Sequence, residues 1–297
     1  ELFSVTGSEY EAIHSAWHKA VKVLPDYSIV HKQDFFIEEK YRPETDRDDL
    51  SFLSRSFERH FNERPFLNHF CYLFLTKTTK ARSRQESTFS TLCKGRLVPK
   101  EIEDRETVTR FLEAVGQFEK IMNDSGLVTL RRLTTDEITG TERSAGIVEK
   151  YLSLSQHDTT VLKDIQLNPE EMRIGDDILC LHTLSDTEDL PGKVATDSRY
   201  ERLSTDRSDC RLSFAAPVGL LLDCNHCYNQ YIFIDDHGEN LKRFEQTARN
   251  MHSLSRYSRS NQINKAWIEE YLNEAHSKGL TSVRCHCNVM AVSYTHL

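Results

Sequence analysis

The spacing of apolar residues predicts two amphipathic helices near the start of the chain. Apolar positions three or four residues apart turn one face of each segment toward a core. The first helix begins at Ser8-Glu-Tyr-Glu11, where the side chains of Ser8 and Glu11 can bond each other's backbone amides, and it ends at Pro25-Asp26. The second covers Leu53 to Phe61 and stops before Pro65.

A longer helix is predicted from about Asp104 to Ser125, because Gly126 follows in the position that favours a left-handed helix cap. Its inward stripe consists of Val108, Phe111, Leu112, Val115, Phe118 and Met122. The same spacing predicts further helices at Ala145–Leu154, Glu239–Leu254 and Asn261–Lys278.

Strands are predicted where apolar residues alternate or run continuously. Asn68 to Lys77 is apolar at both alternating positions, which predicts an interior strand covered by helices on both sides. A hairpin turns at Gly175-Asp-Asp177, and Thr78 to Pro99 is predicted to be a mobile basic loop. Further strands are predicted at Leu2–Val5, Tyr27–Glu38, Leu127–Leu133, Val161–Leu167, Gly219–Leu222, Tyr228–Ile234 and Ser282–Val292.

Alternating helices and strands predict a mixed α+β fold with at least one layered sheet, built as one large or two closely packed subdomains. A boundary near Gly140 separates an N-terminal α/β subdomain, residues 1–140, from a β-rich part with two C-terminal helices, residues 141–292. Residues 293–297 are interpreted as a non-native tail.

A charged stretch interrupts this pattern. Between Ser185 and Arg211 the chain has 27 residues, of which seven are acidic and five basic, with no helical or strand period. Long irregular segments in a folded chain are functional or disordered. The charges nearly balance and Tyr200, Leu203 and Cys210 lie among them, so an ordered segment is favoured.

The same part of the chain carries a resemblance to a known family. Leu179–Asp186, Asp189–Lys193, Leu203–Arg211 and Tyr228–Asp236 closely resemble the TraG-family ATPase of conjugative transposons. Similar stretches are Gly7–Val23, Leu53–Thr79, Phe111–Thr139 and Leu254–Asn288, so the likeness spans nearly the whole chain. The family energises a type IV secretion (conjugation) machine, and the chain looks like its N-terminal region, upstream of the nucleotide-binding domain.

Composition narrows the function classes. The chain has 297 residues, is 38% hydrophobic and 28% charged, and carries a formal net charge of −8. This balance argues against general affinity for nucleic-acid phosphates, which requires clustered Lys and Arg. No apolar run reaches the length of a membrane span, and the eight cysteines are expected to be reduced in a cytoplasmic setting.

The sequence lacks the loop that would bind ATP. A phosphate-binding loop requires Gly, four residues and then Gly-Lys-Ser/Thr, but Gly192-Lys193 is followed by Val194 and has Thr187 where the first Gly should stand. Asp235-Asp236 is therefore interpreted as a strand-terminating turn. By resemblance, ATP and Mg²⁺ belong to a downstream domain, and no catalytic, cofactor-binding or metal-binding residue is assigned to this chain.

Four cysteines offer a competing interpretation. Cys224 and Cys227 have zinc-knuckle spacing, and Cys285 and Cys287 could complete a tetrahedral site. The second pair, however, alternates in phase with Val289, which places both on the apolar face of a strand. The alternative function is a zinc-stabilised nucleic-acid-binding module of a mobile element.

The other polar candidates have simpler explanations. Asp206, Arg207, Asp209 and Arg211 are expected to form ion pairs that brace the charged stretch, with contact to a partner protein as a close second. His182 is expected to be a satisfied core or sheet histidine without a catalytic role. Four arginines on the helix Glu239–Leu254 and just after it are expected to form a solvated face. They are Arg243, Arg249, Arg256 and Arg259. Whether Arg249 or Arg256 acts on a neighbouring subunit stays open.

These observations predict a non-catalytic module of a conjugal transfer ATPase. The resemblance implies that it packs against its own downstream ATPase domain, docks that domain to inner-membrane components of the channel, and belongs to a homo-oligomer at the cytoplasmic side of the inner membrane. Direct binding of nucleic acid is not expected.

Overall fold

The computed structural model describes residues 5–41, 51–62, 64–79, 103–154, 164–169, 171–175, 177–184, 194–213, 216, 221–255 and 257–293. Over these ranges the chain has the predicted α+β fold, with seven helices, a seven-stranded antiparallel sheet and a small two-stranded ladder. The helices are α1 (Gly7–Val23), α2 (Phe52–Asn62), α6 (Arg105–Asp124), α7 (Thr135–Thr139), α8 (Ile147–Ser153), α10 (His237–Leu254) and α11 (Arg259–Lys278). The strands are β1 (Ser28–Lys40), β2 (Pro65–Lys77), β3 (Ile165–Leu167), β4 (Met172–Ile174), β5 (Asp177–Thr183), β6 (Ser198–Arg199), β7 (Arg211–Leu212), β8 (His226–Ile234) and β9 (Val283–Ser293).

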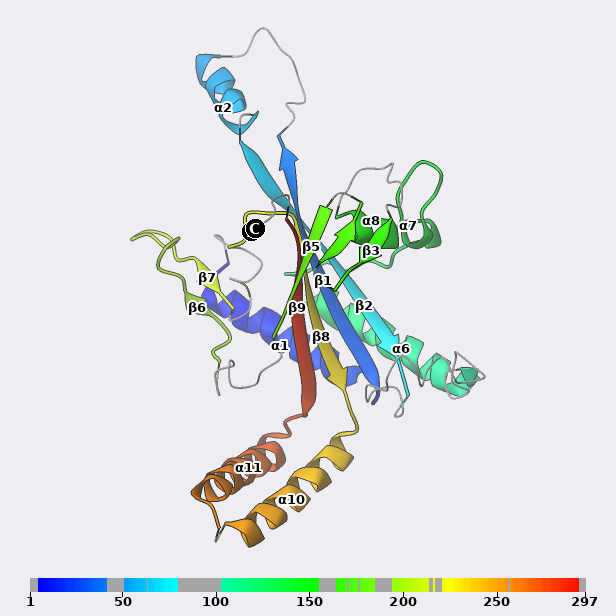
Figure 1. Cartoon of the computed structure of the whole chain (residues 1–297). Coiled ribbons are helices and arrows are strands. Elements are labelled where there is room, and N and C mark those ends of the chain that lie inside the picture. Colours follow the sequence, from blue (N-terminus) through cyan, green and yellow to red (C-terminus); the bar gives the residue numbers. More distant parts are fainter. Residues whose placement is uncertain are drawn as a thin grey trace.

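The main sheet joins strands that are far apart in the sequence. Its order is β2-β1-β8-β9-β5-β4-β3, and every neighbouring pair is antiparallel. Central strand β1 pairs with β2 on one side and with β8, nearly 200 residues later, on the other. Strands from both sides of the predicted boundary at Gly140 therefore belong to one sheet (Figure 1).

One face of the sheet is covered by α1 and α6, which pack side by side. Apolar residues of both helices form a cluster with strand residues, centred on Phe118 of α6 (1% exposed) and Val30 of β1. Val30 is directly opposite Leu75 on β2 and Ile232 on β8, so these residues share the helix-covered face. Of the predicted core stripe of α6, Phe118 and Met122 are buried on this side.

The other face is covered by α8 around Phe35, which is fully buried. Tyr151 of α8 meets the Phe35 ring edge-on, with ring centroids 6.2 Å apart. Beside this apolar cluster, a row of amide side chains crosses β1, β8 and β9. Asn229 accepts a hydrogen bond from Gln33 at 3.0 Å and donates one to Asn288 at 3.0 Å.

Two parts project from the sheet at opposite ends (Figure 1). At one end, β1 and β2 continue past the edge of β8 and carry α2 at their tip. At the other, the chain leaves β8 into the antiparallel pair α10 and α11 and returns into β9. We call this pair the helical hairpin. No helix in the described ranges is long and apolar enough to cross a membrane.

Several predicted elements are confirmed. The ends of α1, α2, α6, α10 and α11 agree with prediction within about two residues, and such boundaries are defined no better than this. Gly126 has a left-handed φ of +70°, as its position after α6 predicted. The predicted hairpin joins β4 to β5 at Gly175, which has a φ of +62°.

Four predictions about elements were wrong. The cap of α1 is Thr6, whose hydroxyl accepts from the Glu9 amide while the Glu9 carboxylate accepts from the Thr6 amide at 2.7 Å. The box at Ser8 was wrong because two Ser/Thr-x-x-Glu sequences overlap here and only the earlier one starts the helix. The segment predicted as an interior strand is edge strand β2, which pairs only with β1 among the described strands.

Leu127 to Leu133 forms no strand, because the Asn123 side chain satisfies the Leu130 backbone in place of a neighbouring strand. Val108 and Leu112 of the inward stripe are 39% and 54% exposed. Most of the predicted strands Leu2–Val5 and Gly219–Leu222 and of the loop Thr78–Pro99 lie outside the described residues, and the tail does so except for Ser293.

Candidate docking surfaces

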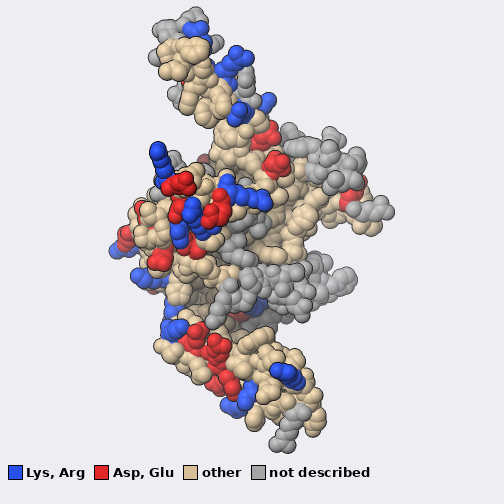
Figure 2. All heavy atoms as spheres, turned by 90° about the vertical axis from the view of Figure 1, so that its left-hand side faces the viewer, with Lys and Arg blue, Asp and Glu red and all other residues tan. Residues whose placement is uncertain are grey.

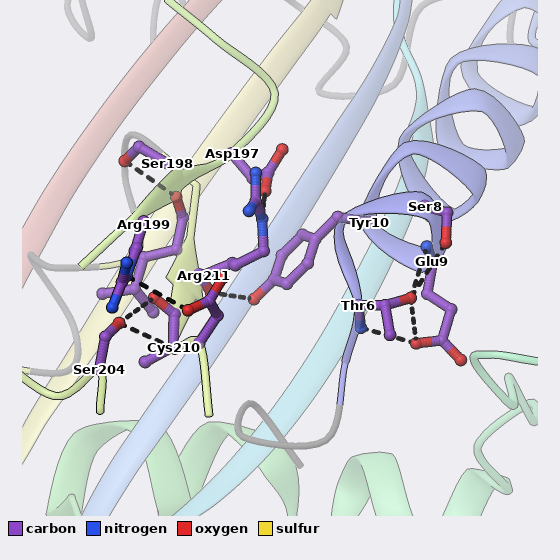
Figure 3. Close-up of polar contacts among 12 residues, drawn as sticks. Thr6, Ser8, Glu9, Tyr10, Asp197, Ser198, Arg199, Ser204, Cys210 and Arg211 are labelled. Atoms are coloured by element: carbon purple, nitrogen blue, oxygen red, sulfur yellow. Dashed lines mark hydrogen bonds and ion pairs between the residues drawn. The ribbon is translucent and has the colours of Figure 1, made fainter. Parts of the chain in front are cut away.

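The charged stretch is anchored on the N-terminal part of α1 (Figure 3). Ser198–Arg199 in its middle pairs with Arg211–Leu212 at its C-terminal end in the β6–β7 ladder, and the Tyr10 hydroxyl of α1 donates a hydrogen bond to the Arg211 carbonyl at 2.7 Å. Cys210 and Leu212 on either side of that carbonyl are 1% and 2% exposed. Apolar side chains thus bury the stretch at its base, and one long-range hydrogen bond fixes it to the helix.

Ion pairs hold the backbone of the stretch together. The Arg211 guanidinium pairs with Asp197, and this hydrogen bond raises the pKa of Arg211. Arg199 pairs with Asp209 at 3.2 Å and with Glu201 at 3.6 Å (Figure 3 shows Asp197, Arg199 and Arg211). The prediction of internal bracing is confirmed for Arg211 and Asp209.

The outer part of the stretch is exposed to solvent. Asp206 and Arg207 lie at a turn in which the Thr205 amide donates to the Ser208 carbonyl at 2.8 Å, and both are exposed. Leu203, between charged neighbours, is 47% exposed. At mid-height on this side of the molecule acidic and basic side chains lie close together (Figure 2). Such a mixed surface suits a specific protein partner better than a uniformly charged polymer.

The tip helix α2 has four exposed apolar residues. We call Phe52, Leu53, Phe57 and Phe61 the α2 apolar face; they are 82%, 77%, 59% and 42% exposed. The Phe57 and Phe61 rings contact each other with centroids 4.5 Å apart. Contiguous exposed apolar residues of this kind mark protein or membrane contacts.

A second apolar surface lies where the helical hairpin meets α1. A groove of about 500 Å³ is lined by His18, Phe244, Trp267, Ile268, Tyr271, Leu280, Thr281, Ser282 and Val283. Trp267 remains 65% exposed at its rim, and the Phe244 and Tyr271 rings form its floor with centroids 5.2 Å apart. The groove therefore offers an aromatic surface, in which the Phe244 and Tyr271 rings meet edge to face, with the large side chain of Trp267 left mostly exposed.

Neither protein-family models nor curated proteins gave a match to the chain.

The four cysteines of the zinc interpretation do not share one face of the sheet. Cys227 lies opposite Met290 in the buried cluster beside α8, whereas Cys285 and Cys287 lie opposite Ile232 and Gln230 on the other face. Burial raises the pKa of the Cys227 thiol to about 12, which disfavours the thiolate that binds metal. Among the described residues, no group of three or more His, Cys, Asp or Glu side chains is placed to hold a metal ion.

The acidic pair after β8 terminates the strand, as predicted. Asp236 is the N-cap of α10 and accepts from the Glu239 amide at 2.9 Å. Asp235 receives a forked pair of hydrogen bonds from Arg284 on β9, at 2.6 and 3.1 Å. Both carboxylates therefore have structural roles at the base of the helical hairpin.

The arginine series is split by the structure. Arg249 pairs with Glu245 one turn away at 3.7 Å, in the way expected of a solvated helix face. Arg243 and Arg259 are exposed, and Arg256 lies outside the described residues. His182 lies on β5 and is exposed, so it is a sheet histidine at the surface.

One polar centre was missed by sequence reasoning. Asp34 on β1 is 3% exposed and contacts His69 at 2.9 Å and Lys32. Burial would raise the pKa of Asp34, but its hydrogen bonds to His69 and Lys32 outweigh burial and lower it. The only signal in the sequence is an acidic residue inside an apolar strand. His69 could not be identified as its partner without the register between β1 and β2.

Proposed function

We propose that this chain is the non-catalytic N-terminal module of a conjugal transfer ATPase, and that it serves docking and assembly. The observation that carries the proposal is the placement of exposed apolar side chains on the two projecting parts. The α2 apolar face lies at one end, and Leu254, Tyr257, Ile263 and Trp267 of the helical hairpin region, each more than 40% exposed, lie at the other. Surfaces with this composition are typical of protein and membrane contacts.

The helical hairpin and its groove are the proposed contact with the nucleotide-binding domain. An exposed tryptophan beside an aromatic floor is the kind of anchor that dominates binding energy in protein interfaces. The braced charged stretch, on the same side as α1, would supply polar specificity at the rim. The resemblance of the sequence to TraG-family ATPases supports this arrangement, and the absence of a phosphate-binding loop from the sequence supports a role without hydrolysis.

The test measures how tightly this chain and variants of its groove bind the nucleotide-binding domain of the ATPase. Trp267→Ser is expected to weaken association of this chain with the separately purified nucleotide-binding domain by at least about tenfold. Leu181→Ser, on β5, is the matched control, since Leu181 is 54% exposed and pairs with Met290, seven residues along β9 from the groove residue Val283. ATP hydrolysis by the purified chain alone, abolished by changing one of its own side chains, would refute the proposal.

A further inference from the structure

Helix α2 presents its apolar residues on a single side. At 3.6 residues per turn the α2 apolar face occupies roughly half of the helix circumference, an arc that also holds Ser56 and His60, and Arg55 and Arg59 lie in the other half. Every described α2 residue except Glu58 is exposed. An 11-residue helix gains little stability in water from its own hydrogen bonds. Something must therefore cover this face when the helix performs its role.

The residues around the α2 apolar face have the pattern of a helix that lies in a lipid headgroup layer. Such helices combine Phe and Leu on one side with Arg on the other, because the guanidinium groups reach the phosphates while the rings enter the acyl boundary. The acidic side chain of α2 is directed elsewhere: Glu58 accepts a hydrogen bond from Tyr41 at 3.3 Å. Phe66, at the start of β2 and four residues after the helix, is also exposed, at 46%.

The position of α2 suits contact with a plane. Pairing of β1 with β8 ends at Phe36, but pairing of β1 with β2 continues to Lys40. The last four residue pairs thus form a two-stranded ribbon that carries α2 roughly 13 Å beyond the sheet. Figure 1 shows the helix at the extremity of the molecule, and in Figure 2 its surface is mostly uncharged, with basic side chains beside it. A convex ridge at an extremity can reach a flat surface without interference from the body.

The distribution of charge also favours an orientation in which α2 faces the membrane and the rest of the chain points away from it. The chain carries −8, so most of it would be repelled by an anionic bilayer. Residues 40–66 contain six basic and six acidic side chains and are neutral overall. The tip is therefore a part of the molecule that can approach anionic lipids at little electrostatic cost.

We propose that α2 is an interfacial membrane anchor that lies in the headgroup layer of a phospholipid bilayer, with Phe52, Leu53 and Phe57 inserted. This anchor would deepen the docking role proposed above. It rests on that proposed function, which identifies the membrane as the inner membrane. It names lipid as the occupant of the α2 apolar face and leaves the helical hairpin for protein.

Vesicle flotation of the whole chain tests the anchor. The chain is expected to float with phosphatidylcholine vesicles and more strongly with vesicles that also contain phosphatidylglycerol. Combined replacement of Phe52, Leu53 and Phe57 by Ser is expected to reduce partition at least about tenfold, since burial of each side chain contributes much of the affinity. Combined Arg55→Gln and Arg59→Gln is expected to reduce only the phosphatidylglycerol contribution, by about fivefold per arginine.

Trp267→Ser is the control variant, because it removes an equally exposed aromatic ring from the helical hairpin and should float like the unaltered chain. Circular dichroism and urea unfolding should be unchanged in all variants, since the altered residues are exposed. Failure to float, or flotation unaffected by the triple Ser variant, would overturn the anchor. So would a concentration-dependent dimer that the triple variant abolishes, because α2 would then bind a second copy. Loss of binding to the nucleotide-binding domain in Trp267→Ser is measured separately, so the two proposals can fail independently.

Discussion

The hydrogen bond between Tyr10 and the Arg211 carbonyl should control how firmly the charged stretch is held on α1. Tyr10→Phe removes only the hydroxyl, so the ring keeps its packing while the carbonyl loses its donor at 2.7 Å. A partly buried hydrogen bond of this kind contributes about 1 kcal/mol. Because the bond joins two segments 201 residues apart, its loss should act on local opening of the stretch more than on global unfolding.

The expected result is an increase of about fivefold in the opening equilibrium, which is about 1 kcal/mol converted to a ratio. Hydrogen exchange measured by mass spectrometry reports it at the amides held inside the stretch. The Tyr200 backbone amide donates to the Cys210 carbonyl at 2.8 Å, and the Cys210 backbone amide donates to the Ser204 hydroxyl at 3.0 Å. Exchange at both amides should accelerate by the same factor, since they are released in one opening event.

Tyr257→Phe is the matched control, because Tyr257 is 83% exposed and the substitution removes the same hydroxyl from the helical hairpin region. Its exchange in the charged stretch should equal that of the unaltered chain. Equal exchange in both variants would refute the claim that Tyr10 anchors the stretch. A large fall in the urea midpoint for Tyr10→Phe would show instead that the stretch belongs to the global folding unit.

Three further outcomes follow from the packing and the charges. Phe118→Ala should lower the free energy of unfolding, measured in urea, by about 3 to 5 kcal/mol, because Phe118 is buried in the core. Leu112→Ala on the same helix should lower it by less than about 1 kcal/mol, because Leu112 is exposed. Similar losses in the two variants would contradict the assigned core. Asp34→Asn should cost about 1 to 2 kcal/mol at neutral pH, since its partners are partly exposed. The pKa of Asp34 is lower in the folded chain than in the unfolded chain. The stability that its ion pairs contribute is therefore present above the unfolded pKa of about 4 and is lost as pH falls through the folded pKa. If Asp34→Asn were as much less stable than the unaltered chain at pH 2 as at neutral pH, the ion pairs would be contradicted. Chelation by EDTA should leave the unfolding midpoint unchanged, because Cys227 faces away from the other strand cysteines, and loss of strand signal would contradict that geometry.

Local signals in the sequence predicted the elements well. Gly126 and Gly279 each follow a helix and adopt the left-handed conformation that stops it, so both helix ends could be predicted from one residue. The pair Gly175-Asp176 between two short apolar runs likewise predicted the turn of a hairpin. In these cases one backbone conformation depends on a residue within two positions, so the sequence window contains the cause.

The remaining features depend on contacts that a sequence window does not contain. A continuous apolar run predicted an interior place for β2, but apolar residues on both faces reveal nothing about whether a strand has one neighbour or two. The bond from Tyr10 and the pairing of Asp34 with His69 require the register of distant segments. The charged stretch could be predicted to brace itself because its charges balance, yet Asp197 and Arg199 were missed as partners.

The strand order imposes a delay on folding during synthesis. Central β1 has β2 as an early neighbour, but its other edge stays open until β8 has been made, 157 residues after the end of β2. At ribosomal rates this amounts to roughly 10 to 30 seconds. During that interval the unpaired edge of β1 and the rings of the α2 apolar face are both accessible in the nascent chain. Binding of this nascent chain to a chaperone, or of its α2 apolar face to a membrane, before β9 is translated and completes the sheet would protect these exposed groups from aggregation.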